Sequence, residues 1–203
     1  FVLLEQAREW KTIEPDAKDL FLEQVMTYLD ATELEPVHLQ FLSNVVQLMK
    51  RAQDPDSADK LCTAAHPLFL KSDNRQVVDQ AKQFFLTNDL SSWPNLAADE
   101  KEALMERVIA YLNETEIGTQ HLQWINQLGR QIEYTGTPEE AAKLFVSVQP
   151  ILLKSDNERI VESAKGFDGL IRRLRLPGNR MPIEGILLDG TEFDLSSYPG
   201  KVV

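Results

Sequence analysis

The residues that could carry out chemistry are few, because the chain of 203 residues has one cysteine and three histidines. The single thiol, Cys62, is the obvious candidate nucleophile, and it has no partner for an internal disulfide. Its neighbours at helical spacing, Ala58, Leu61 and Ala65, are apolar, and a buried unpaired cysteine behaves as a small hydrophobic residue. We therefore predict that Cys62 fills the core, and cysteine usage does not indicate a redox compartment.

The histidines do not form a predicted metal or acid-base site. His38 and His121 are each followed by Leu-Gln, but no second histidine, cysteine or carboxylate stands at ligand spacing from either one. We expect both histidines to take part in packing at the start of a helix. His66 precedes Pro67, and this pair predicts a turn at the surface.

Aromatic and basic residues leave alternatives open. One aromatic group either lines a peptide groove or holds adjacent helices together, and the second role is favoured; its members are Trp10, Trp93, Trp124, Tyr28 and Tyr111. The basic cluster Arg172, Arg173 and Arg175 either complements the dipole of the last predicted helix or docks against an acidic surface of another domain. Acidic residues fall in predicted first turns, and no two stand out as an acid-base pair. The sequence thus predicts no catalytic, cofactor-binding or metal-binding residue.

Composition narrows the classes of partner. A hydrophobic content of 43% can fill a sizeable core, so the chain is globular. The net charge of −11 argues against nucleic acid and against an anionic membrane surface, because both repel such a field. No apolar run approaches the roughly 20 residues that a membrane span needs. Protein or peptide partners remain the expected class.

An internal duplication dominates the sequence. The stretch "LFLKSDNRQVVDQAKQF" returns 83 residues later as "ILLKSDNERIVESAKGF", and 25 of the 70 positions that align residues 16–85 with residues 99–168 are identical. The same offset pairs Trp10 with Trp93 and Phe1 with Phe84. We infer two copies, residues 1–83 and 84–166, and expect that Phe1 lies inside a helix of a longer protein.

Each copy is predicted to contain about four helices, because apolar residues recur at the spacing of an amphipathic helix. In the first copy these helices are centred on residues 21–29, 39–49, 58–65 and 77–84, the third being short. Two helical hairpins in 83 residues match two HEAT-like or tetratricopeptide-like units in size, although neither consensus is present. The predicted fold is all-α, with a tandem duplicated four-helix repeat over residues 1–176.

Helix starts and joints are predicted from capping residues and prolines. Ser155 and Glu158 have the spacing of a capping box, whereas Ser72 and Arg75 in the first copy keep only the cap. Prolines are expected at the joints, where a missing N–H costs least. They are Pro15, Pro36, Pro55, Pro67, Pro94, Pro138 and Pro150.

The last residues follow a different pattern. Residues 177–182, which include Pro177, Gly178 and Asn179, read as a linker, and "IEGILL" and "TEFDL" flank Asp189-Gly190 as a β-hairpin within residues 183–203. "MPIEGILLDGTEFDLSSYPGKVV" resembles the start of a redoxin domain of the thioredoxin superfamily, in the TlpA-like and AhpC/TSA-related group. The resemblance is carried by Pro182, Asp189-Gly190, Phe193, Leu195-Ser196, Tyr198, Gly200-Lys201 and Val202-Val203.

This resemblance implies that the longer protein is a thiol-disulfide oxidoreductase or a peroxiredoxin-like antioxidant protein. In such domains the reactive cysteine follows the strand begun by "KVV", often as W-C-x-x-C, so the resemblance places catalysis after Val203 and none in this chain. It also implies a bacterial, extracytoplasmic protein. The helical part then serves as an interaction or spacer domain. The alternative is a stand-alone helical scaffold that binds peptides or proteins and has no redox role.

Overall fold

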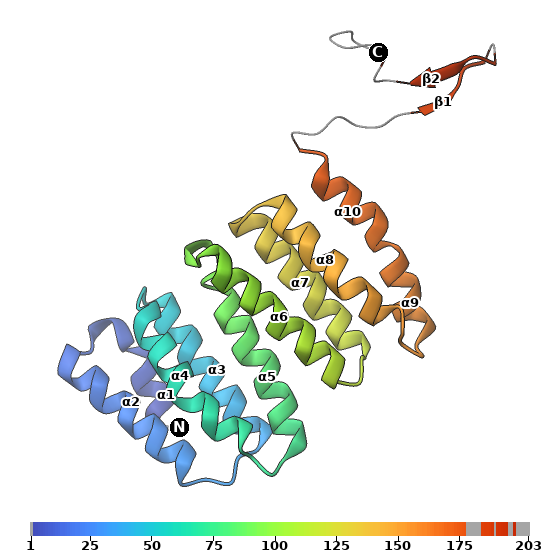
Figure 1. Cartoon of the computed structure of the whole chain (residues 1–203). Helices are drawn as coiled ribbons and strands as arrows, with labels where there is room; N and C mark the ends of the chain where they lie inside the picture. Colours follow the sequence, from blue (N-terminus) through green and yellow to red (C-terminus); the bar gives the residue numbers. More distant parts are fainter. Residues whose placement is uncertain (1, 178–183, 189, 195–196, 198–203) are drawn as a thin grey trace. The chain divides into compact units, whose positions relative to one another are not determined.

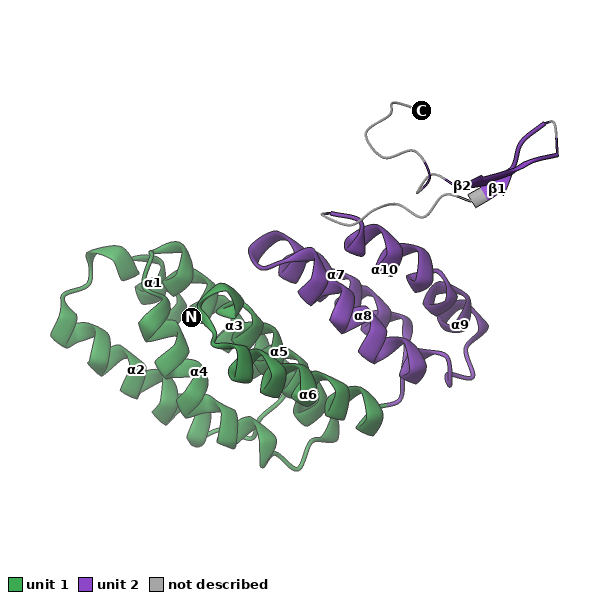
Figure 2. Ribbon diagram, turned by 45° about the horizontal axis from the view of Figure 1, so that its top comes forward, with its two compact units in different colours: residues 1–115 green, residues 116–203 purple. Residues whose placement is uncertain are grey.

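Helical periodicity covers most of the chain, and the computed structural model is accordingly mostly helical, with a short two-stranded antiparallel sheet near the C-terminus (Figure 1). It describes residues 2–177, 184–188, 190–194 and 197. The chain divides into two compact units, residues 1–115 and 116–203 (Figure 2). Within the described residues, no helix has both the length and the apolar character needed to cross a membrane.

The first unit is built from helices joined by short connections. Its elements are α1 (Val2–Arg8), the 3-10 turn η1 (Trp10–Thr12), α2 (Pro15–Asp30), α3 (Pro36–Arg51), α4 (Pro55–Leu70), α5 (Arg75–Leu90), η2 (Trp93–Asn95) and α6 (Ala98–Glu114). Helix α4 packs between α3 and α5, while α2 packs on α4, α3 on α5, and α6 on α5. The predicted copy boundary at residue 84 lies within α5.

The second unit repeats this style of packing. Its elements are α7 (Thr119–Thr135), α8 (Pro138–Leu152), α9 (Glu158–Lys165), α10 (Phe167–Arg175), β1 (Glu184–Ile186) and β2 (Glu192–Asp194). Helix α8 packs against α7 on one side and against α10 on the other (Figure 1).

The apolar stripes predicted from periodicity form the core. On α3 the side chains of Leu42, Val45 and Met49 are completely buried, as are Ile125, Leu128 and Ile132 on α7. These six residues share one face of their helices, because they recur at intervals of three and four residues. Helix stability here comes mainly from this buried face, since isolated helices of 16 or 17 residues are marginal in water.

Two predictions about prolines and helix length were wrong. Pro67 and Pro150 lie inside α4 and α8, in the last turn of each helix, and α4 is a full 16-residue helix where a short one was predicted. A proline there removes one hydrogen bond and no more than the end of the helix. Packing outweighs that loss, because Ala65 and Phe69, on either side of Pro67, are completely buried. The other predicted joints agree with the structure, and four of those prolines occupy the first turn of a helix.

The predicted capping box at Ser155 was also wrong. Helix α9 begins at Glu158, which leaves that glutamate too close to the start to reach back. Asn157 is the cap, and its Oδ1 accepts a hydrogen bond from the backbone N of Arg159 at 3.0 Å. The Ser155 hydroxyl instead accepts from the backbone N of Asn157 at 3.3 Å. Asn74 and Ser72 divide the same two roles before α5.

The C-terminal strands form a hairpin. β1 and β2 pair antiparallel with Gly185 opposite Phe193. The turn is closed by Gly190, whose backbone N donates to the carbonyl of Leu187 at 2.9 Å and whose φ of +85° is the left-handed conformation that glycine tolerates best. Asp189, the linker residues after Pro177, and the remaining residues of the redoxin-like pattern (182, 195–196, 198 and 200–203) lie outside the described residues.

Candidate functional site

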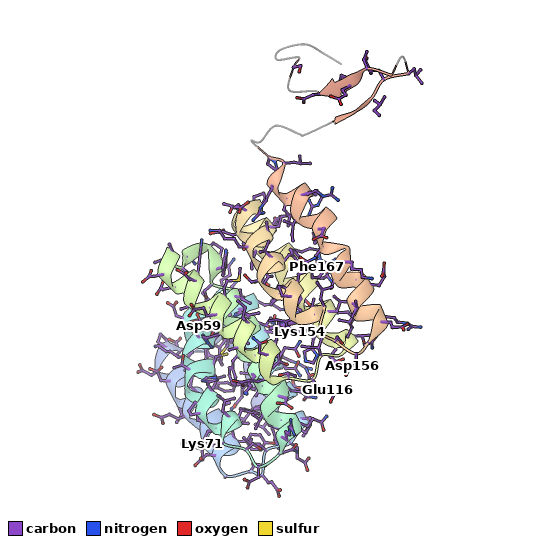
Figure 3. All side chains as sticks on the ribbon, turned by 45° about the vertical axis from the view of Figure 1, so that its right-hand side comes forward. Asp59, Lys71, Glu116, Lys154, Asp156 and Phe167 are labelled. Atoms are coloured by element: carbon purple, nitrogen blue, oxygen red, sulfur yellow. The ribbon has the colours of Figure 1, made fainter. Side chains whose placement is uncertain are left out.

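A polar cavity of about 690 Å³ in the first unit is the best candidate site. Helix α4 contributes Asp59, Cys62, Thr63 and His66 to its lining, and α5 contributes Phe85, Asn88 and Asp89. Ser92 and Leu96 line it from the connection to α6, and Glu100, Ala103, Leu104 and Arg107 line it from α6 itself. Its volume and its mixture of apolar wall with convergent polar groups are typical of ligand-binding pockets. Asp59 is labelled in Figure 3.

A hydrogen-bond network built around Asn88 forms one wall. Asn88 is only 8% exposed, and its Oδ1 accepts a hydrogen bond from Lys50 Nζ at 2.8 Å. Its Nδ2 donates to Asp59 Oδ1 at 3.3 Å. Lys50 Nζ also donates to the Ser91 hydroxyl at 2.6 Å, and this hydroxyl donates to the backbone carbonyl of Asn88. A buried amide needs such partners, because an unsatisfied polar group in the interior is costly.

The opposite wall, on α6, carries one ion pair and one helix cap. Arg107 Nη1 lies 2.8 Å from Asp89 Oδ2, and both side chains are partly exposed. Glu100 Oε2 accepts a hydrogen bond from the backbone N of Ala97 at 2.8 Å, so this carboxylate caps the start of α6. The positive charge of Arg107 is therefore already matched by a carboxylate from α5.

Cys62 is buried, as predicted, and its thiol is unsuited to nucleophilic attack. Burial raises the pKa of the thiol, Lys50 lowers it, and Asp59 and Asp89 raise it further, with the result that the pKa rises to about 12. The thiolate is the reactive form, so Cys62 stays protonated and inert near neutral pH. It supplies apolar surface to the polar cavity.

His66 was predicted in a surface turn, and this was wrong. It lies within α4, is half-buried, and packs edge-on against Phe85 with ring centroids 4.7 Å apart. Burial and the nearby Arg107 lower its pKa, while Asp89 opposes them. The imidazole is therefore neutral near pH 7 and adds no positive charge to the polar cavity.

His38 and His121 act at helix starts, which confirms the sequence-based prediction. Each imidazole Nδ1 accepts a hydrogen bond from the backbone N of the capping residue, Glu35 at 2.9 Å and Gly118 at 3.0 Å. Both histidines are more than nine-tenths buried. Among the described residues, no group of three or more histidine, cysteine, aspartate or glutamate side chains is placed to hold a metal ion.

The tryptophans are core residues and do not line a groove. Trp10, Trp93 and Trp124 are at most 5% exposed, which confirms the favoured alternative. Trp10 packs edge-on against Phe21 of α2, with ring centroids 5.4 Å apart. The tyrosines differ, because Tyr111 is buried whereas Tyr28 is 41% exposed and packs against Phe41.

Trp10 also belongs to a charged cluster at the start of α4. Its Nε1 donates to Asp54 Oδ2 at 3.0 Å, and Lys18 Nζ donates to the same oxygen at 2.9 Å while lying over the indole ring. Asp54 Oδ1 accepts from the backbone N of Ser57. Burial raises the pKa of Asp54, but the hydrogen bonds from Lys18, Ser57 and Trp10 outweigh it and lower the pKa from 3.8 to about 2. This carboxylate is structural.

The basic cluster of α10 is held by carboxylates of its own unit. Arg173 donates two hydrogen bonds of 2.9 Å to Glu133 of α7, and Arg175 donates to Glu139 of α8 at 3.2 Å and 3.4 Å. Arg172 Nε donates to the backbone carbonyl of Asp168 at 3.3 Å. Two of the three guanidinium groups are therefore already paired with acidic side chains.

Comparison with known proteins adds no relative: no protein-family profile, no curated protein and no solved structure matches the chain.

The polar cavity and its key residues, Asp59 and Asn88, were missed by sequence reasoning. Their separation of 29 residues gives no motif, because two different helices bring them together. A signal was present in the alignment of the two copies, where Asp59 stands opposite Ala142 and Asn88 opposite Ile171. A polar residue that replaces an apolar one at a core position of a repeat marks a place where the copies differ in role.

Proposed function

We propose that residues 1–176 form a duplicated helical interaction domain and that it belongs to a thioredoxin-like thiol-disulfide oxidoreductase or peroxiredoxin-like protein. The element bounds support the duplication, because α6, α7, α8 and α9 each begin 83 residues after α2, α3, α4 and α5. The 3-10 turns η1 and η2 are separated by the same offset. A solenoid of this kind offers extended surfaces for protein partners.

The hairpin carries the redox half of this proposal. Its turn glycine, Gly190, has the conformation that the Asp-Gly pattern calls for, and its apolar side chains lie in solvent: Ile186 is 78% exposed and Leu188 is fully exposed. Two strands alone are marginally stable, and apolar side chains on a strand normally face a core. A hairpin with these properties suits a larger sheet, as the redoxin resemblance requires.

The thiol chemistry is assigned to cysteines beyond residue 203. Within residues 1–203 the single thiol, Cys62, is buried with a raised pKa, so it is a poor attacking group. The helical domain would then position the redoxin domain or bring it to its partners.

The test begins with the coding sequence that follows Val203. The proposal expects an apolar strand and then a cysteine, either in W-C-x-x-C or alone as in a peroxidase. The protein encoded by the whole gene should then reduce insulin disulfides or peroxide, and serine in place of the downstream cysteine should abolish this while Cys62→Ser leaves it unchanged. A stop codon, a polar tail, or activity that depends on Cys62 contradicts the proposal.

A stand-alone peptide-binding scaffold is the second candidate, and the polar cavity favours it. The cavity lies wholly within the helical part and needs no redoxin domain to bind a ligand. A gene that ends soon after residue 203, together with ligand binding by the helical part, would support this candidate in place of the first.

A further inference from the structure

The polar cavity occurs in a place that the same helical framework can fill with apolar side chains. On the proposed duplication, the positions of Asp59 and Asn88 correspond to Ala142 and Ile171, which are 0% and 9% exposed. Cys62 corresponds to the larger Phe145, which is also buried. The packing of these helices therefore does not require a polar wall. Polar groups in such a wall are best explained by contact with something outside the fold.

Asp59 is the group in that wall whose charge is left unmatched. It is half-buried, and among the described residues it takes part in no ion pair; its one hydrogen bond is the 3.3 Å contact from the neutral amide of Asn88. The nearby cations are engaged elsewhere, Arg107 with Asp89 and Lys50 with Asn88 and Ser91. A partly buried carboxylate without a cationic partner favours a cationic ligand.

The rest of the lining indicates that this cation has an apolar stem. Phe85 and Leu104 are buried residues of the wall, and Leu96 lies beside them, half-buried. Long basic side chains pack their methylene groups on such surfaces while the charged head meets a carboxylate. The net charge of −11 adds long-range attraction for a basic partner.

We propose that the polar cavity binds a lysine or arginine side chain of a partner peptide, with the cationic head at the Asp59 carboxylate and the stem against Phe85 and Leu96. This rests on the proposed function as an interaction domain and names the chemistry of its partner. The alternative source of such a cation is a free alkylamine, and the experiment separates the two.

The probe is the peptide acetyl-Leu-Lys-Leu-amide, titrated into the isotope-labelled chain at low and at physiological ionic strength. We expect backbone resonances of Thr63, Asn88 and Ala103 to shift in a saturable way, and binding to weaken at the higher salt because the contact is ionic. The isosteric peptide with norleucine in place of lysine should bind at least about tenfold more weakly.

Two variants locate the contact. Asp59→Asn should weaken binding at least about fivefold, whereas Asp56→Asn, an exposed aspartate one turn earlier on α4, should leave it unchanged. Thr63→Trp changes an exposed residue of the lining and fills the cavity, so it should abolish binding without disturbing the core. Circular dichroism confirms that each variant is folded.

Three results would overturn this proposal: equal binding of the lysine and norleucine peptides, an Asp59→Asn variant that binds like the original, or resonance shifts outside the polar cavity. Butylamine that competes as well as the peptide would assign the cavity to a free amine, which contradicts a peptide partner. The titration depends on no cysteine, and the thiol assays depend on no residue of the cavity except the Cys62 control. Failure of either proposal is therefore seen separately from failure of the other.

Discussion

Helices α4 and α5 in the first unit can be set beside α8, α9 and α10 in the second, since each set begins with a proline-led helix and ends on an apolar core. In the first set a half-buried aspartate and a buried asparagine line a cavity. In the second, alanine and isoleucine occupy the corresponding positions and are buried. The difference teaches that this framework specifies the path of the backbone, while the interior at this point is free to become a core or a site.

A second difference concerns how the paired helices are filled. Val46 on α3 and Cys62 on α4 are both of moderate size, and their counterparts are Gly129 on α7 and Phe145 on α8. A Cβ added at Gly129 would collide with the ring of Phe145. The second pair thus combines the smallest residue with a large one, and interiors packed to crystal density require such complementary volumes.

The largest expected effect comes from breaking this second pair. Gly129→Val inserts a branched side chain where the Phe145 ring lies, and we expect a loss of about 3 kcal/mol or more in the free energy of unfolding, because overpacking a core forces side chains and backbone apart. Urea denaturation followed by the fluorescence of Trp124, which lies in the second unit, measures the loss.

The paired change supplies the control for this prediction. Gly129→Val with Phe145→Cys recreates the first copy's pair, so the double variant should be more stable than the sum of the two single losses predicts. Gly169→Ala on α10 adds a Cβ into open space, so it should leave stability unchanged or raise it by up to about 1 kcal/mol. Strict additivity of the two core substitutions would contradict the comparison.

The helix caps should differ next. Asp54 caps α4 and also accepts hydrogen bonds from Trp10 and Lys18, whereas Thr137 caps α8 through the backbone N of Glu140. We expect Asp54→Ala to cost about 2 to 3 kcal/mol and Thr137→Ala about 1 kcal/mol. Asp54→Thr keeps the cap and loses the other two bonds, so its cost should lie between them in the same urea measurement. Equal costs for Asp54→Ala and Thr137→Ala would show that the cluster adds nothing.

A pH series sharpens this contrast. The pKa of Asp54 is about 2 in the folded chain against an ordinary 3.8, so the carboxylate contributes stability above about pH 4 and this contribution is lost as the pH falls toward 2. We expect about 1 to 2 kcal/mol, less than the full shift implies, because the side chains of Asp54 and Lys18 are 22% and 25% exposed. The measurement is the difference in unfolding free energy between the original chain and Asp54→Asn at each pH. A difference that stays constant from pH 5 to 2 would argue against the shift.

The smallest expected effect is one in which the copies agree. His38→Ala and His121→Ala each remove the acceptor for a capping-residue N–H, so each should lower the unfolding free energy by about 1 kcal/mol. Gln40→Ala, which changes an exposed residue of α3, is the control and should change it by less than about 0.5 kcal/mol. An effect in only one copy would show that the two histidines have different roles.

The helices could be predicted from the sequence because their apolar stripes repeat over 16 or so residues and the duplication reads each stripe twice. The ends were harder to predict. In "KSDN" both the serine and the asparagine are good caps, and only the position of the first helical turn assigns Asn74 and Asn157 that role. Pro67 and Pro150 were misplaced because local steric rules do not include the buried face that holds the last turn of α4 and of α8.

The polar cavity could not be predicted from local sequence at all. Its lining comes from three helices spread over residues 59–107, and each residue by itself is an ordinary member of a helix. Asp59 has no special neighbours along the chain, and its position beside Asn88 exists only after α4 and α5 pack together. Single-residue arguments about Cys62, His38 and His121 succeeded, because local apolar spacing and helix-start position decide their environments.

The most direct test of the account asks whether the polar wall is there for stability or for binding. The double variant Asp59→Ala with Asn88→Ile places the second copy's residues in the first copy, and its unfolding free energy and its affinity for acetyl-Leu-Lys-Leu-amide should be measured together. We predict stability within about 1 kcal/mol of the original or above it, because both partners of the hydrogen bond are replaced by apolar groups, and loss of peptide binding. A loss of several kcal/mol in stability, or an unchanged affinity, would contradict the account.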